Sequence, residues 1–182
     1  KVFFEYEKIS EDYRWVFILS YHKIIPKKEL ELHEHNLVIH TSALPLGKGW
    51  SPLFWQVLEG KNKITFTLFE ADELIDSGLI YFQRELNLSG YELHDELRDK
   101  QARMTKDICL EYIKNYEKFS NPITPDGGES IYKKRVPSDS KLDIDKTLRD
   151  QFNLLRIANN SDYPAYFEID NHKFYLKIES EE

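Results

Sequence analysis

The sequence has little that would mark a secreted, disulfide-bonded or membrane-embedded protein. Its 182 residues include one cysteine, Cys109, which cannot form an internal disulfide. No apolar run reaches the length of a membrane span, and no signal-peptide pattern opens the chain. These absences predict a cytoplasmic protein without a membrane partner.

The chain also lacks an excess of positive charge. Lys and Arg number 25 against 32 Asp and Glu, which gives a formal net charge of -7. Proteins that neutralise a phosphate backbone need the opposite balance, so a DNA or tRNA substrate is disfavoured. Neither G-x-G-x-x-G nor a P-loop occurs, so no recognised nucleotide cradle is present.

The sequence does contain the pattern of a packed α/β core. Hydrophobic residues make up 41% of the chain and aromatic residues 14%. Periodicity and turn signals predict strands at residues 2–6, 15–20, 37–40, 63–69 and 79–86. Helices are expected at 26–35, 52–60 and about 90–119. The last is expected to start at a capping box of Ser89 and Glu92 and to bury Leu93, Leu97, Met104, Ile108 and Ile113.

Composition changes at Ser120. Residues 120–144 are rich in Pro, Gly and Ser and indicate a connecting segment. Beyond it, Asp145 is expected to cap a helix over 146–159, and residues 165–178 to form a hairpin that turns at Asp170 and Asn171. We therefore predict a core over 1–119, a linker over 120–144 and a small α+β subdomain over 145–182. Because Lys1 leads directly into an expected strand, we expect upstream sequence to be missing.

Two residues are candidates for chemistry. His40 ends an expected parallel strand, at the edge where open α/β sheets bind ligands, although a histidine bonded inside a turn is about equally expected. Asp76 lies in the apolar segment "LIDSGLI", where it is either a turn residue or a desolvated carboxylate that needs a partner. Such a carboxylate stabilises the protonated form of a neighbouring histidine.

The loop "TSALPLGKGWSP", residues 41–52, is also unusual. Gly47 and Gly49 allow a close backbone approach to a ligand, and Lys48 between them offers a charge for an anionic group. Other features favour structural roles. His33 and His35 lack the further ligands of a metal site, and Cys109 fits a core position. The basic run at 132–137 is typical of a solvated face, with contact to a phosphate as the alternative.

Two stretches resemble a known family. "IHTSALPLGKGWSP" (39–52) and "WQVLEGKNKITFTLFEADELIDSGLIY" (55–81) resemble the core signature of folate-dependent formyltransferases. This superfamily includes glycinamide ribonucleotide, methionyl-tRNA and sugar N-formyltransferases. Its histidine in H-x-S-x-L-P-x-x-x-G and its aspartate in D-x-G act together, and His40 and Asp76 match them at the family's spacing of 36 positions. Residues 20–26 and 132–178 resemble further family segments, so the likeness spans most of the chain.

The resemblance implies a Rossmann-like α/β fold. Its sheet would be mostly parallel with helices on both faces, residues 1–119 would be the formyltransferase catalytic core, and an N-terminal β-α unit would be missing. His40 and Asp76 would be catalytic, and no metal would be needed. The folate cosubstrate would contact Tyr21, His22, Ile24, Ala71, Leu74, Ile75 and Asp76. The acceptor would contact Ser42, Lys48, Gly49 and Trp50.

The resemblance further implies formyl transfer from 10-formyltetrahydrofolate to an amine. We expect a nucleotide-linked amino sugar used in surface polysaccharide biosynthesis, because the charge and the short C-terminal part disfavour tRNA, and glycinamide ribonucleotide enzymes generally lack such an appendage. The expected partners are these small molecules, without nucleic acid, and a homodimer is compatible with the sequence. Three alternatives stay open: a methionyl-tRNA formyltransferase-like enzyme, a catalytically impaired folate-binding homologue, and a formyltetrahydrofolate hydrolase.

One position departs from the family pattern. Val38 stands where family members usually carry an asparagine whose amide helps to bind the formyl oxygen. Asn36 lies on the same strand face, but at strand rise it starts about 13 Å from His40. A simple replacement of one asparagine by the other is therefore not expected.

Overall fold

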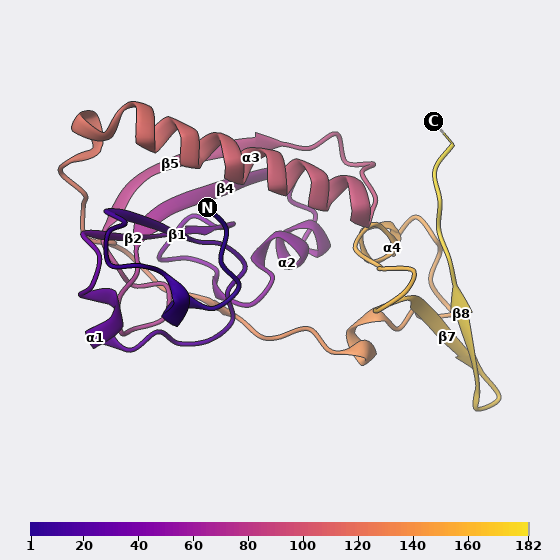
Figure 1. Ribbon diagram of the computed structural model, residues 1–182. Coiled ribbons are helices and arrows are strands. Elements are labelled where there is room, and N and C mark those ends of the chain that lie inside the picture. Colours follow the sequence, from indigo (N-terminus) through magenta and orange to yellow (C-terminus); the bar gives the residue numbers. More distant parts are fainter. Residues whose placement is uncertain (182) are drawn as a thin grey trace.

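The computed structural model describes residues 1–181 and has a four-stranded sheet at its centre (Figure 1). The strands are β1 (Trp15–Ile18), β2 (His35–His40), β4 (Lys63–Glu70) and β5 (Ile80–Asn87), in the order β1-β2-β4-β5. The helices of this part are α1 (Lys27–Leu30), α2 (Pro52–Leu58) and α3 (His94–Lys114). The predicted α/β class is confirmed.

The prediction of a mostly parallel sheet is wrong in detail. β1 and β2 pair in parallel, whereas β2 pairs antiparallel with β4, and β4 antiparallel with β5. The reason lies in the connections. α2 lies at the edge where β2 ends, so the chain enters β4 from that edge and runs in the opposite direction, without the crossover that a parallel pair requires (Figure 1).

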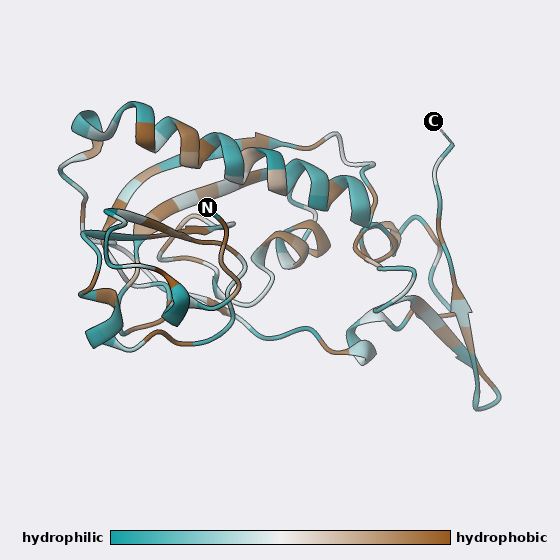
Figure 2. Cartoon of the chain, in the orientation of Figure 1, coloured by the Kyte–Doolittle hydropathy of each residue, from teal (hydrophilic) through white to brown (hydrophobic). Residues whose placement is uncertain are grey.

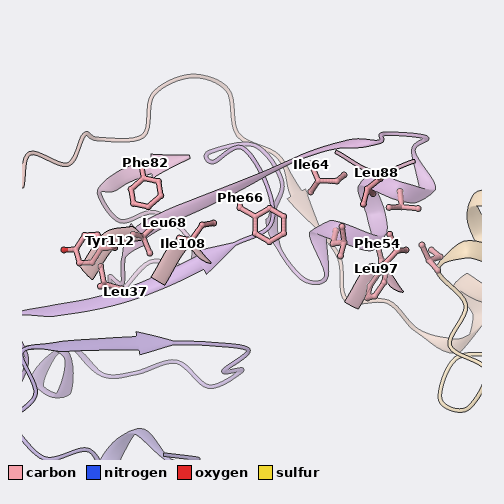
Figure 3. Packing of buried hydrophobic residues seen from close by; sticks show 13 residues of the cluster. Leu37, Phe54, Ile64, Phe66, Leu68, Phe82, Leu88, Leu97, Ile108 and Tyr112 are labelled. Carbon is pink, nitrogen blue, oxygen red and sulfur yellow. The ribbon is translucent and has the colours of Figure 1, made fainter. Parts of the chain in front are cut away.

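The main core lies between the sheet and helices α2 and α3 (Figure 3). Leu53 and Val57 of α2 and Leu97, Ile108 and Tyr112 of α3 are almost fully buried there. The strands contribute Leu37, Ile64, Phe66, Leu68 and Phe82. On the opposite face of β1, Val16 packs against Tyr6, Ile25 and Leu30, which belong to the N-terminal segment and the α1 region. Helices α2 and α3 therefore cover one face of the sheet, whereas the N-terminal segment and the α1 region cover β1 on the other.

α3 differs in detail from its expected form. Glu92 accepts hydrogen bonds from the N–H groups of Ser89 and Gly90 and so closes a turn ahead of the helix. The helix itself begins at His94, where Glu96 accepts from the N–H of Leu93. Hydrophobic and hydrophilic residues alternate along α3 (Figure 2), but Tyr112 rather than Ile113 completes the buried stripe, and Ile113 is 43% exposed.

Two other expected elements are corrected. Residues 2–6 form no strand, and a 3-10 turn, η1 (Tyr6–Lys8), begins at the last of them. Tyr6 is held through its contacts with Val16 and Leu30 rather than by strand pairing. The C-terminal helix α4 spans only Phe152–Arg156 and is not capped by Asp145. Residues 143–151 form turns instead, in which the Gln151 side chain bonds to the backbone of Asp143.

The C-terminal hairpin is confirmed. β7 (Ala165–Ile169) and β8 (His172–Leu176) pair antiparallel, and Asp170 and Asn171 both have positive φ, as a two-residue hairpin turn requires. Between the core and this hairpin, η2 (Tyr116–Phe119) and η3 (Pro137–Ser140) are short 3-10 turns. An unexpected pair, β3 (Lys48–Gly49) with β6 (Ile131–Tyr132), fastens the predicted linker to the core. The division into domains stays a prediction.

A buried ion pair joins α4 to the turn before α3. Arg156 and Glu92 are 1% and 3% exposed, and the guanidinium donates to the Glu92 carboxylate over 3.3 Å and to the Glu92 carbonyl over 3.2 Å. Burial opposes ionisation of Glu92, but the N–H donors around it and Lys100 outweigh burial and lower its pKa to about 2. Because Glu92 has a lower pKa folded than unfolded, its stabilisation is full above pH 4.5 and is lost as pH falls towards 2.

We expect Glu92→Gln to lower the free energy of unfolding at pH 7 by about 3 kcal/mol, because Arg156 stays buried without a counter-charge. The difference from the parent protein should shrink as pH falls from 4.5 to 2. Urea unfolding at several pH values measures both effects. Glu85→Gln is the control, because Glu85 belongs to an exposed pair with Lys63. A constant difference across this pH range would contradict the account.

Candidate active site

His40 lies at the end of β2, opposite Thr67 of β4. Its side chain is 10% exposed, and Nε2 lies 2.8 Å from the Gly47 carbonyl oxygen. A carbonyl only accepts, so Nε2 is the donor in this contact. Nδ1 has no hydrogen-bond partner within residues 1–181 and is the nitrogen left to accept a proton.

Asp76 approaches Nε2 of His40 from another loop. Its Oδ2 lies 3.8 Å from Nε2 of His40 and accepts a 2.8 Å hydrogen bond from the N–H of Gly49. Asp76 has φ 50°, a conformation that non-glycine residues rarely adopt and that persists only where surrounding contacts hold it. The structure therefore brings together the two residues that the sequence pattern paired.

Close backbone approach explains the glycines around this pair. A Cβ on Gly78 would lie 1.7 Å from the Glu70 carbonyl oxygen, which would block the turn after Asp76. Gly49 has φ 94°, and a Cβ there would lie 2.5 Å from the carbonyl oxygen of Tyr132 in β6. Both loops thus reach their positions only without a side chain at these points.

A cavity of about 430 Å³ opens beside His40 and Asp76. Its size is that of a small-molecule site, and its wall mixes aliphatic side chains with a few polar groups. It is lined by the seven residues that the family resemblance assigned to folate: Tyr21, His22, Ile24, Ala71, Leu74, Ile75 and Asp76. Gly49 and Trp50, assigned to the acceptor, line it as well.

Two other expected acceptor residues lie outside the cavity wall. Lys48 is buried, and its ammonium donates to Ser77 over 2.9 Å and to Glu129 over 2.7 Å. It therefore ties the Asp76 loop to residues 120–144 instead of offering a free charge. Ser42 is 2% exposed and packs under Gly47, where a Cβ would meet it at 2.9 Å.

The departure at Val38 is visible in the cavity wall. Val38 lines the cavity, where it offers no hydrogen-bond donor. Asn36 does not replace the missing amide, because its Nδ2 donates to the Leu30 carbonyl over 2.8 Å and its Oδ1 accepts from the Tyr6 hydroxyl. Asn36 is thus a structural residue that fastens the N-terminal segment and the end of α1 to β2.

The weaker candidates have structural roles. His33 is buried with Nδ1 2.8 Å from the Tyr13 carbonyl oxygen, and His35 contacts Glu70 and Tyr116. No cluster of potential metal ligands occurs within residues 1–181. Burial raises the pKa of Cys109 to about 11, so its thiol stays protonated.

No helix within residues 1–181 has the length and apolar character to cross a bilayer. The cytoplasmic location stays a prediction.

The sequence reasoning missed part of the cavity wall. Arg98 and Gln101 of α3 line it, although α3 was expected to serve only the core. Ser20 and Ser51 also line it and share the positive φ of Asp76. The three-residue spacing of Arg98 and Gln101 on a polar helix face is a weak signal, whereas nothing local marks the two serines.

Curated proteins of similar sequence are methionyl-tRNA formyltransferases. Methionyl-tRNA formyltransferase of Thermodesulfovibrio yellowstonii is 28% identical over 144 residues, which is 78% of this chain and 47% of the relative. The chain spans about half the length of the curated relatives it matches. They therefore contain additional sequence beyond the aligned part.

Solved structures share the fold. Methionyl-tRNA formyltransferase from Clostridium thermocellum superposes with a TM-score of 0.74 at 24% identity, over 91% of this chain and 72% of that one. A 4-N formyltransferase from Francisella tularensis gives 0.73 at 21% identity, over 93% and 72%. HypX from Aquifex aeolicus in complex with tetrahydrofolic acid gives 0.71 at 17% identity, over 91% and 29%.

The family comparison covers the segment that holds His40, Asp76 and all the residues that line the cavity. Residues 5–113 match the family described as formyl transferase, and this segment includes both loops and most of α3. The match takes in more than half of the chain. The chain therefore belongs to the formyl transferase family.

Proposed function

We propose that this chain forms the catalytic part of an enzyme that transfers a formyl group from 10-formyltetrahydrofolate to the amine of a nucleotide-linked amino sugar. The observation that carries the proposal is the approach of His40 to Asp76 at 3.8 Å in the wall of a cavity of about 430 Å³. A folate suits this cavity, because aliphatic side chains and the segment 71–76 line it. Surface polysaccharide biosynthesis is the proposed use of the product.

His40 is the proposed proton acceptor. As the amine nitrogen bonds to the formyl carbon, Nδ1 of His40 takes the proton that the nitrogen releases. The same proton is then available for the folate nitrogen when its bond to the formyl carbon breaks, so charge and atoms balance. Asp76 and the Gly47 carbonyl hold the Nε2 side of the ring, and Asp76 stabilises the imidazolium that forms.

A second candidate substrate is methionyl-tRNA, because the relative from Thermodesulfovibrio yellowstonii bears that name. The amino sugar takes precedence here because the chain has a net charge of -7, whereas a protein that neutralises a tRNA backbone needs an excess of positive charge. Within the basic run at 132–137, Arg135 is buried and bonds to the Ile157 carbonyl and Ser140. Assays of the full-length protein with methionyl-tRNA and with a panel of nucleotide amino sugars distinguish the two.

We expect His40→Ala and Asp76→Asn each to lower kcat by about a hundredfold or more, because each removes part of the proton-accepting unit. Release of tetrahydrofolate, measured with the accepted amine, gives the rate, and His172→Ala on the exposed hairpin is the control. Thermal unfolding of each variant tests that the fold is kept. Turnover near the parent rate in either variant would remove the proposed mechanism.

We expect Val38→Asn to raise kcat by about tenfold or more, because the amide adds a donor for the oxyanion at a position that already lines the cavity. The same assay without an amine measures formyl hydrolysis. A parent protein that binds folate without turnover, and gains turnover in Val38→Asn, would be an impaired homologue. Tetrahydrofolate release that needs no amine would identify a hydrolase instead.

A further inference from the structure

The proposed reaction leaves one wall of the cavity without a role. Arg98 and Gln101 of α3 line the same cavity as His40 and Asp76. The two side chains are joined by a 2.9 Å hydrogen bond from Nη1 of Arg98 to Oε1 of Gln101. α3 therefore does more than cover the sheet, because its second turn brings a guanidinium to the site.

The charge of Arg98 is not matched within the described chain. Arg14, Arg84 and Arg156 each pair with a glutamate, whereas no carboxylate of residues 1–181 lies within salt-bridge distance of Arg98. The guanidinium carbon instead lies 5.9 Å from the centre of the Phe54 ring. An arginine held by a ring and an amide, with free donors beside a cavity, is suited to bind a phosphate.

An aromatic platform lies on the same cavity. Trp50 lines it and is 43% exposed, and Nζ of Lys134 lies 5.0 Å from the centre of its ring. Among the other charged groups of the wall, Asp72, Glu73 and Asp76 lie on the loop proposed for folate, and His22 and Lys23 follow β1. The cavity thus combines an exposed indole with an unpaired guanidinium, which are complementary to a base and a phosphate.

We propose that Arg98, positioned by Gln101, binds the diphosphate of the nucleotide-linked acceptor, with the base against Trp50. The inference rests on the proposed function and specifies its acceptor: the recognised group is a nucleoside diphosphate. Gln101 is a positioning residue, since its Oε1 fixes the guanidinium. Recognition of the acceptor then depends on α3, and the chemistry on the loops of His40 and Asp76.

Binding of UDP and dTDP to the full-length protein, measured by calorimetry with and without 5-formyltetrahydrofolate, tests the inference separately from turnover. Arg98→Gln should lower the affinity for the tighter-binding nucleotide by about tenfold or more. Arg98→Lys should lower it by less, because a lysine keeps the charge but cannot donate two parallel hydrogen bonds to a phosphate. Arg103→Gln is the matched control, an exposed arginine of α3 that does not line the cavity. Folate affinity should not change.

A second comparison uses Gln101. Gln101→Glu places a carboxylate against Arg98 and should lower the nucleotide affinity more than Gln101→Leu does. The carboxylate offsets the charge of the guanidinium and repels the phosphate, whereas a leucine does neither. Equal nucleotide affinity in the parent and Arg98→Gln would overturn the inference, as would a parent that binds neither UDP nor dTDP. Nucleotide binding that depends on Arg98, without formyl transfer to any amine, would support the site and contradict the proposed function.

Discussion

The hydrogen bond from the N–H of Gly49 to the Asp76 carboxylate joins two loops that are far apart in the sequence. One loop follows β2 and the other follows β4, and the site requires them to meet. Their meeting depends on the absence of a Cβ at Gly49 and Gly78, where side chains would collide with carbonyl oxygens. The strained φ of Asp76 is held by this contact, so the same bond that joins the loops also aims the carboxylate at His40.

The rest of the chain keeps these loops in place. β6 pairs with β3 and thereby fastens residues 120–144 to the glycine-containing loop, while Lys48 bonds to Ser77 and Glu129 on either side. α2 and α3 pack against one face of the sheet, and α3 also supplies Arg98 to the cavity. The buried pair of Arg156 and Glu92 then anchors the C-terminal part beside the start of α3.

Local patterns in the sequence predicted the elements whose causes are local. β4 and β5 follow from alternation, and the hairpin turn follows from Asp170 and Asn171. The direction of β4 beside β2 and the pairing of β3 with β6 could not be predicted, because they depend on distant segments. The burial of Lys48, which was expected to face an anion, could not be predicted either, because it depends on contacts with the distant residues Ser77 and Glu129. The approach of His40 to Asp76 was anticipated from the family resemblance rather than from periodicity.

The most direct test of the catalytic role of His40 is a crystal structure of the full-length protein with 5-formyltetrahydrofolate and a nucleotide amino sugar. We expect the pterin to lie against residues 71–76 and the amine nitrogen to lie about 3 Å from Nδ1 of His40. A folate bound outside this cavity, or an amine that reaches the formyl group without contacting His40, would contradict it.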